Sequence, residues 1–138
     1  MGNYHFYHAL EIRYADIDAQ GHVNNAKYLT YMEQARMAYF LHLGMWDGAS
    51  FMDIGTILAQ TTVNYLAPIR LMQPVRAGVR VSRLGNKSLT MAYCLEDTQT
   101  GQTLATGESV IVAYDYRHHT SIPLPEAWRQ AITTFETH

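Results

Sequence analysis

Residues 26–43 form an almost uninterrupted apolar run with the spacing of an α-helix. Four of its side chains recur at intervals that place them on one face of such a helix: Tyr28, Met32, Ala35 and Tyr39. Other apolar residues widen this face far beyond a single stripe: Leu29, Tyr31, Ala38, Phe40 and Leu41. The helix would be about 27 Å long. A helix this apolar must be covered by the rest of the protein on most sides.

The ends of this helix carry recognisable signals. Asn24 or Asn25 is a suitable N-cap, because a short amide side chain accepts hydrogen bonds from the free N–H groups of a first turn. Gly44 is a suitable stop. Only a thin polar strip is predicted to face water, made of Lys27, Thr30 and Gln34.

Strand-like segments flank the helix on both sides. Residues 8–14 alternate, with Leu10, Ile12 and Tyr14 on one side of a half-buried strand. After a connecting loop at 45–53, further segments rich in strand-forming residues follow with no helix between them: 54–67, 75–82, 89–95 and 103–114.

The last three of these segments read as an antiparallel meander, with turns at Gly85-Asn86 and at 97–101. In the last segment, one face is shared by Leu104, Thr106, Glu108, Val110, Val112 and Tyr114. A short amphipathic stretch within 121–138 predicts a terminal helix. A single apolar helix among strands is buried only if the sheet curls around it. We therefore predict an α+β fold with a curved antiparallel five-stranded sheet wrapped around one long central helix.

Composition favours one compact soluble domain over residues 1–138, with a tail from about residue 117. The 138 residues are 48% hydrophobic and carry a formal net charge of -2, which suits a chain that buries its own core. The N-terminus lacks a basic region followed by an apolar stretch, so neither secretion nor membrane spanning is expected. Cys94 is the only cysteine, which favours a cytoplasmic location, and we interpret it as a small buried strand residue.

Positive charge is concentrated in residues 54–95, which contain no acidic residue and carry Arg70, Arg76, Arg80, Arg83 and Lys87. Such a segment suits either a phosphate-binding face or a solvated sheet surface, and both interpretations stay open. Nucleic acid is a weaker candidate, because the pI is near 6.4 and no nucleic-acid motif is present.

The segment between the first strand and the helix, residues 13–25, concentrates the chemistry. Asp16 and Asp18 lie two residues apart, so an extended backbone points them in opposite directions and only one faces a substrate. Asp18 is nearer the helix, where a carboxylate activates water or attacks a carbonyl. Backbone N–H groups around Asn24 and Asn25 polarise the carbonyl oxygen. Together these groups describe an acyl-transfer site, although Asp18 as a turn residue and His22 as a loop residue remain alternatives.

Three rival motifs fail on their residues. An EF-hand loop starting at Asp16 would need glutamate at its twelfth position, where Lys27 stands. A zinc site from Asp16, Asp18 and His22 has no companion cysteine or histidine at ligand spacing. A serine hydrolase lacks its Gly-x-Ser-x-Gly.

The pattern Arg13-Tyr14-x-Asp16-x-Asp18-x-x-Gly21-His22-Val23-Asn24-Asn25-x-x-Tyr28-x-x-Tyr31-x-Glu33-x-Ala35-Arg36 resembles the signature of hotdog-fold acyl-CoA thioesterases of the 4-hydroxybenzoyl-CoA thioesterase type. The later Asn64-Tyr65-x-x-Pro68-Ile69-Arg70 fits it too. The resemblance implies a homodimer or homotetramer with active sites at the subunit junction. It also implies that the broader acyl-CoA branch, which shares the His22-Val23 form, is the nearer one.

Residue by residue, the resemblance places the catalytic carboxylate on Asp18 and the carbonyl-polarising N–H on Asn25. It makes Gly21 the point where the backbone approaches the thioester, gives Asn24 a bracing role, and leaves His22 in the catalytic loop. Glu33 is a reserve candidate for the carboxylate, because another hotdog branch places its carboxylate on this helix; its neighbours Lys27 and Arg36 suggest an ion pair instead.

The predicted activity is hydrolysis of an acyl-CoA, with Asp18 as general base or nucleophile. We expect Tyr28 in the acyl pocket, and Arg70 and Arg76, with Arg80 or Lys87, at the CoA phosphates. No metal or dissociable cofactor, nucleic acid or membrane is expected as a partner. Two alternatives remain: a binding module for acyl-CoA or an acylated carrier, and an enoyl-CoA hydratase, whose Asp-x4-His spacing Asp18 and His22 do not match.

Overall fold

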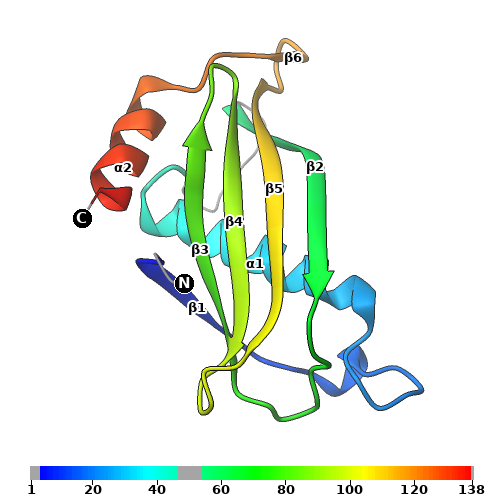
Figure 1. Ribbon diagram of the computed structural model, residues 1–138. Coiled ribbons are helices and arrows are strands. Elements are labelled where there is room, and N and C mark those ends of the chain that lie inside the picture. The colour runs from blue at the N-terminus through cyan, green and yellow to red at the C-terminus, as the bar shows by residue number, and fades with distance from the viewer. Residues whose placement is uncertain (1–3, 47–53, 138) are drawn as a thin grey trace.

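A curved antiparallel sheet holds one long helix against its concave side in the computed structural model, which describes residues 4–46 and 54–137 (Figure 1). In chain order the elements are β1 (Phe6–Leu10), the 3-10 helix η1 (Tyr14–Asp16), α1 (Asn25–His42), β2 (Ile54–Tyr65), β3 (Val75–Leu84), β4 (Ser88–Asp97), β5 (Thr103–Asp115), β6 (Thr120–Ser121) and α2 (Glu126–Glu136). The predicted class and the predicted central helix are confirmed. Most of the predicted 45–53 loop lies outside the described residues.

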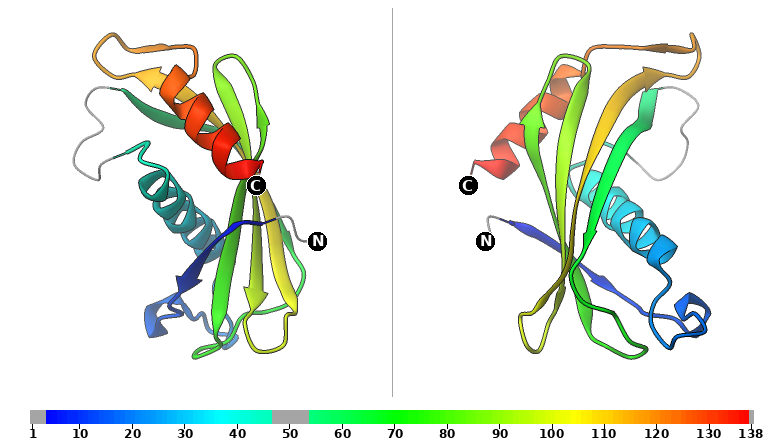
Figure 2. Two further views of the ribbon diagram at one scale, coloured as in Figure 1. Left: turned by 90° about the vertical axis from the view of Figure 1, so that its left-hand side faces the viewer. Right: turned by 45° about the vertical axis from the view of Figure 1, so that its right-hand side comes forward.

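The strands run in the order β1-β3-β4-β5-β2, and every pair is antiparallel. The predicted meander is therefore confirmed, and β2 returns to the far edge beside β5. The two-residue strand β6, which sequence reasoning did not predict, adds to the end of β5. Seen from the side, α1 lies on one face of the twisted sheet and leaves the other face open (Figure 2).

Helix α1 begins and ends where its sequence signals lie. The side chain of Asn24 accepts a hydrogen bond from the N–H of Ala26 at 2.9 Å, and Gly44 adopts a φ of 75° just past the end. Tyr28, Met32, Ala35 and Tyr39 are all buried. Leu29 and Leu41, however, are 41% and 47% exposed, so this single chain leaves part of the apolar surface uncovered.

The sequence grouped Leu104, Thr106, Glu108, Val110, Val112 and Tyr114 on one face of β5. The other face of β5 is the one that contacts α1. Its buried residues below Ala105 alternate as Gly107, Ser109, Ile111 and Ala113. Gly107 lies under Met32, because an added Cβ would stand 2.8 Å from the Met32 sulfur. The predicted alternation is confirmed. Three of the four buried residues that face the helix are small: Gly107, Ser109 and Ala113.

The N-terminal prediction needs a correction. Strand β1 occupies residues 6–10 instead of 8–14, and Tyr14 is 84% exposed. The reason is that the chain turns at Tyr14 into η1, which buries Asp16 instead.

The terminal helix α2 is confirmed and packs on β3. It covers the edge of β3 beyond the end of β1, because the Glu136 carboxylate accepts hydrogen bonds from the N–H of Val81 at 3.0 Å and from the Tyr39 hydroxyl at 2.5 Å. None of the helices in the described residues has the length and apolarity needed to cross a membrane. Cys94 lies half-buried in β4, where burial raises the pKa of its thiol.

Candidate functional site

The loop between η1 and α1 is a tight, hydrogen-bonded turn. Ile17 and Val23 form an isolated antiparallel bridge, and the N–H of Asp18 donates to the carbonyl of His22 at 2.9 Å. Gly21 donates back to the carbonyl of Asp18 at 3.0 Å and adopts a φ of 81°, a conformation that favours glycine. The loop therefore holds Asp18 at one fixed place beside the start of α1.

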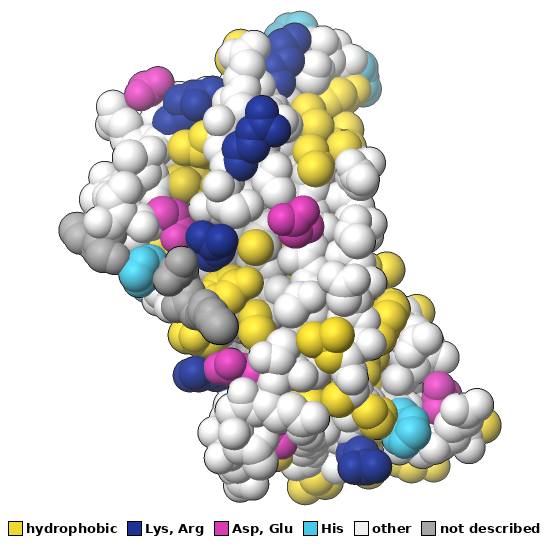
Figure 3. Space-filling model, in the orientation of Figure 1, with side chains coloured by type: hydrophobic (Ala, Val, Ile, Leu, Met, Phe, Trp, Pro, Cys, Tyr) yellow, Lys and Arg dark blue, Asp and Glu magenta, His cyan; other side chains and the backbone are white. Residues whose placement is uncertain are grey.

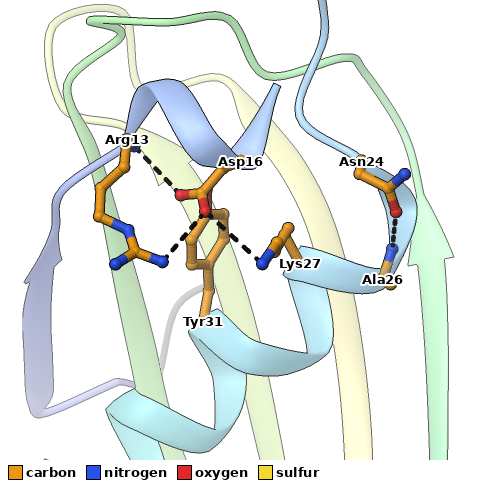
Figure 4. Close-up of polar contacts among 6 residues, drawn as sticks. All are labelled: Arg13, Asp16, Asn24, Ala26, Lys27 and Tyr31. Carbon is orange, nitrogen blue, oxygen red and sulfur yellow. Dashed lines mark hydrogen bonds and ion pairs between the residues drawn. The ribbon is translucent and has the colours of Figure 1, made fainter. Parts of the chain in front are cut away.

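Asp16 is buried and anchors this loop to the helix (Figure 4). Its carboxylate accepts hydrogen bonds from the Tyr31 hydroxyl at 2.7 Å and from the N–H of Arg13 at 3.1 Å, and the Lys27 ammonium lies 4.0 Å away. Burial alone would raise the pKa of Asp16, but the hydrogen bonds from Tyr31 and Arg13 and the charge of Arg13 outweigh it and hold the pKa below its usual value. Asp16 is thus committed to structure.

Asp18, in contrast, is exposed. One carboxylate oxygen accepts the N–H of Gln20 at 2.9 Å, which fixes the side chain in an Asx turn. No hydrogen bond or ion pair with a described residue engages the other oxygen. The structure thus buries Asp16 and exposes Asp18, and one Asp18 oxygen is left without a partner among the described residues. That Asp18 is the functional carboxylate stays a prediction.

The N-terminus of α1 supplies the complementary donor. Asn24 is held by its N–H, which donates to the carbonyl of Asp16 at 2.8 Å, and by the cap on Ala26. The N–H of Asn25 donates to no acceptor in the described part of the chain. The positive end of the helix dipole reinforces such a donor. A developing negative charge is therefore stabilised here.

Asp18 and Asn25 line one pocket with a volume of about 550 Å³. Its other lining residues come from the same loop and helix and from the end of β2: Gln20, His22, Val23, Asn24, Tyr28, Tyr65, Leu66, Ala67 and Pro68. Part of the lining is apolar and aromatic, and Tyr28 and Tyr65 meet there edge to face with their ring centroids 4.8 Å apart. A carboxylate, a free N–H donor and an apolar wall thus meet in one cavity.

The structure separates the predicted site residues into two groups. The half-buried His22, together with Asn24 and Tyr28, lines the pocket beside Asp18 and Asn25, whereas Gly21 shapes the turn behind it. Arg70 follows the pocket residue Pro68 by two positions. It begins a turn in which the N–H of Gln73 donates a hydrogen bond to the Arg70 carbonyl at 3.1 Å.

Arg76 does not line the pocket. Its guanidinium pairs with Glu96 at 2.7 Å and stacks over the ring of Tyr7 at 3.7 Å. Figure 3 shows Lys and Arg side chains spread along the length of the sheet face opposite α1. The roles of Arg70 and Arg76 at the phosphates remain predictions.

Glu33 lies on α1 five residues beyond Tyr28 and does not line the pocket. Its carboxylate stands 3.9 Å from the guanidinium of the buried Arg36, which also donates to the Tyr93 hydroxyl at 3.1 Å. The predicted ion pair with Arg36 is confirmed, whereas Lys27 turns to Asp16.

The sequence did not show which residues of β2 and of the segment after it line the pocket. Tyr65 and the segment 66–68 form the wall, and Gln20 fixes Asp18. The motif from Asn64 to Pro68 was the available signal, but its position beside the helix depends on the pairing of β2 with β5. As for metals, residues 4–46 and 54–137 contain no group of three or more His, Cys, Asp or Glu that could hold an ion. That no metal or cofactor is needed stays a prediction.

Comparison with known proteins assigns the family. The model of the thioesterase-like superfamily matches residues 12–132. A crystal structure of a thioesterase complexed with coenzyme A and Zn, from Thermus thermophilus, is 34% identical, with a TM-score of 0.85 over 100% of this chain and 98% of that chain.

Two curated relatives agree with this assignment. The long-chain acyl-CoA thioesterase FadM of Escherichia coli (strain K12) is 24% identical over 89% of this chain and 93% of its own. The uncharacterized protein YsmA of Bacillus subtilis (strain 168) is 29% identical over 80% of this chain and 73% of its own. The chain therefore belongs to the thioesterase-like superfamily and is a thioester hydrolase of the hotdog fold.

Proposed function

We propose that this enzyme hydrolyses an acyl-CoA to the free acid and CoA. One observation carries the proposal: Asp18, which bears a carboxylate, and Asn25, whose N–H has no acceptor among the described residues, line the same pocket. A thioester carbonyl between them meets a base or nucleophile on one side and a hydrogen-bond donor on the other, which is what acyl transfer requires.

In the general-base form, Asp18 takes a proton from a water, and the water oxygen attacks the carbonyl carbon. The N–H of Asn25 donates to the oxyanion of the tetrahedral intermediate, which then collapses as the C–S bond breaks and the CoA thiolate leaves. In the nucleophilic form, the Asp18 carboxylate attacks the carbon, the thiolate leaves, and water hydrolyses the mixed anhydride. Both forms use the same geometry, and both fit an exposed carboxylate with one free oxygen.

Two similar proteins support coenzyme A as the leaving group. One is the thioesterase from Thermus thermophilus whose crystal structure contains coenzyme A, and the other is the long-chain acyl-CoA thioesterase FadM. We place the phosphates near Arg70, which follows the pocket residue Pro68 by two positions in the chain, and the acyl group against Tyr28 and its neighbours. The chemistry assigned to Asp18 and Asn25 needs no metal or dissociable cofactor. We also propose a cytoplasmic location, where acyl-CoA is made and used.

A homodimer, or a homotetramer built from it, belongs to this proposal. Strand β2 ends the sheet order, and one row of its backbone groups has no strand partner within residues 4–46 and 54–137. Large apolar side chains stand exposed on β2 and on the adjoining side of α1: Leu29, Ile57, Leu58 and Tyr65. A second copy pairing along β2 would cover both features, and sedimentation of the purified protein measures the mass directly.

The test is thiol release from a panel of acyl-CoAs of increasing chain length plus one aromatic member. Release of one CoA thiol per free acid supports the hydrolase. Binding with no release from any member would favour the acyl-binding module. Formation of a 3-hydroxyacyl-CoA without free thiol would favour the hydratase.

A further inference from the structure

Tyr65 occupies the last position of β2 and joins the apolar wall of the pocket to the start of α1. Its ring is 47% exposed, lines the pocket and packs edge to face on Tyr28. Its hydroxyl donates to the backbone carbonyl of Asn25 at 3.2 Å. One side chain thus contacts both the space for the acyl group and the residue that carries the proposed oxyanion donor.

The peptide unit between Asn25 and Ala26 is held at both of its polar atoms. Its carbonyl oxygen accepts from the Tyr65 hydroxyl, and its N–H donates to the Asn24 side chain at 2.9 Å. The preceding N–H, that of Asn25, points from this clamped turn and is bonded to no acceptor among residues 4–46 and 54–137. A donor acts on a developing oxyanion only if it is fixed to within about 0.5 Å, so the clamp serves the donor.

The backbone that carries Tyr65 is itself rigid. Tyr65 stands opposite Ala105 in the ladder between β2 and β5. The next two N–H groups, of Leu66 and Ala67, both donate to the carbonyl of Leu104 at 3.0 Å. The Tyr28 hydroxyl lies 3.4 Å from the carbonyl of Ala67, which braces the same corner from the helix.

The two tyrosines of the wall differ in what they offer a substrate. Tyr28 is 2% exposed, so its ring is covered by its neighbours, whereas nearly half of the Tyr65 side chain is open. An acyl group that enters the pocket therefore meets the Tyr65 ring. Binding of an apolar chain becomes more favourable as it covers such a ring, because both surfaces are removed from water.

We propose that Tyr65 is a positioning residue for the hydrolysis: its hydroxyl fixes the turn that presents the Asn25 N–H, and its ring is the surface against which an apolar acyl group packs. This inference rests on the proposed function and assigns it a substrate class, acyl groups whose first carbons are aliphatic or aromatic rather than charged. Loss of the hydroxyl should then change kcat, and loss of the ring should change KM.

Two substitutions separate the parts. Tyr65→Phe keeps the ring and removes the hydroxyl, and is expected to lower kcat about tenfold for every acyl-CoA while KM changes little, because the loss falls on the transition state. Tyr65→Leu also removes the ring, and is expected to raise KM in addition and to flatten the dependence of KM on acyl length.

The matched control is Tyr116→Phe. The Tyr116 hydroxyl also donates to a backbone carbonyl of β2, that of Thr56 at 2.6 Å, but Tyr116 does not line the pocket. This variant should keep the kcat of the parent. Melting curves of all variants show whether a loss of kcat comes from unfolding.

A kcat for Tyr65→Phe equal to the parent and to the control would overturn the positioning role. The same KM values as the parent, with the same dependence on acyl length, in Tyr65→Leu would overturn the role of the ring. Absence of thiol release from the parent enzyme would instead count against the proposed function, so the two failures are told apart in one experiment.

Discussion

The hydroxyl of Tyr31 donates a 2.7 Å hydrogen bond to the carboxylate of Asp16, and both side chains are buried. This bond joins the second turn of α1 to the loop that carries Asp18. The carbonyl of Asp16 accepts the N–H of Asn24 on the same side. The position of the proposed catalytic carboxylate relative to the helix N-terminus therefore depends on an aspartate that takes no part in the chemistry.

Removing the Tyr31 hydroxyl should destabilise the fold. Tyr31→Phe leaves the buried Asp16 carboxylate without one of its donors, which costs about 1–3 kcal/mol. Chemical denaturation measures the change. Tyr14→Phe is the control, because the Tyr14 side chain is 84% exposed and its change should stay within about 0.5 kcal/mol. Equal stability of the two variants would contradict the anchoring role.

The lowered pKa of Asp16 predicts a pH dependence with a defined sign. Because the folded pKa lies below the unfolded value of about 3.9, ionised Asp16 stabilises the fold above that pH, and the contribution is lost as the pH falls through the folded pKa. Asp16→Asn should therefore be less stable than the parent at neutral pH, and the difference should shrink below about pH 4. Asp97 and Asp115 also have lowered pKa values but remain in both proteins. A difference that is constant with pH would contradict this account.

Asn24→Ala removes the side-chain acceptor for the N–H of Ala26 and should cost about 1 kcal/mol of stability. It should also lower kcat, because the first turn of α1 loses one of its two clamps. Asn24→Asp keeps a cap oxygen and should keep the stability. Melting temperature and kcat, measured together, check both statements, and an Asn24→Ala enzyme with full stability would show that the cap is dispensable.

Arg70→Ala should raise KM for acyl-CoA and leave kcat nearly unchanged, because a phosphate contact far from the carbonyl contributes to ground-state binding. The same variant should act normally on an acyl thioester of N-acetylcysteamine, which has no phosphates. Lys87→Ala is the control: although the sequence made Lys87 a candidate for the phosphates, it lies in the turn between β3 and β4, which Figure 1 shows at the other end of the sheet from the start of α1. Equal effects of the two variants would remove Arg70 from the CoA site.

The sequence predicted most of the helices and strands, and it predicted that Asp16 and Asp18 point in different directions, because both depend on local patterns. Period-two alternation identified β3 and β4, and the cap at Asn24 and the stop at Gly44 bounded α1. Tyr14 was placed wrongly in a strand, because the alternation of Leu10 and Ile12 continues into η1, where a buried Asp16 redirects the chain.

Features that depend on distant pairing were beyond local patterns. Tyr65 lies 40 residues after Asn25 in the chain. It contacts Asn25 only because β2 pairs with β5 in the sheet. Arg76 stands opposite Glu96 in the register between β3 and β4, which gives it an ion pair that its sequence neighbours do not announce.

The most direct test of the account compares Asp18→Asn with Glu33→Gln in thiol release from one good acyl-CoA substrate, with melting curves to show that both are folded. The account predicts a loss of at least about a hundredfold in turnover for Asp18→Asn and turnover near that of the parent for Glu33→Gln. Nearly full activity of Asp18→Asn, with the loss falling on Glu33→Gln, would contradict it and move the catalytic carboxylate to the helix.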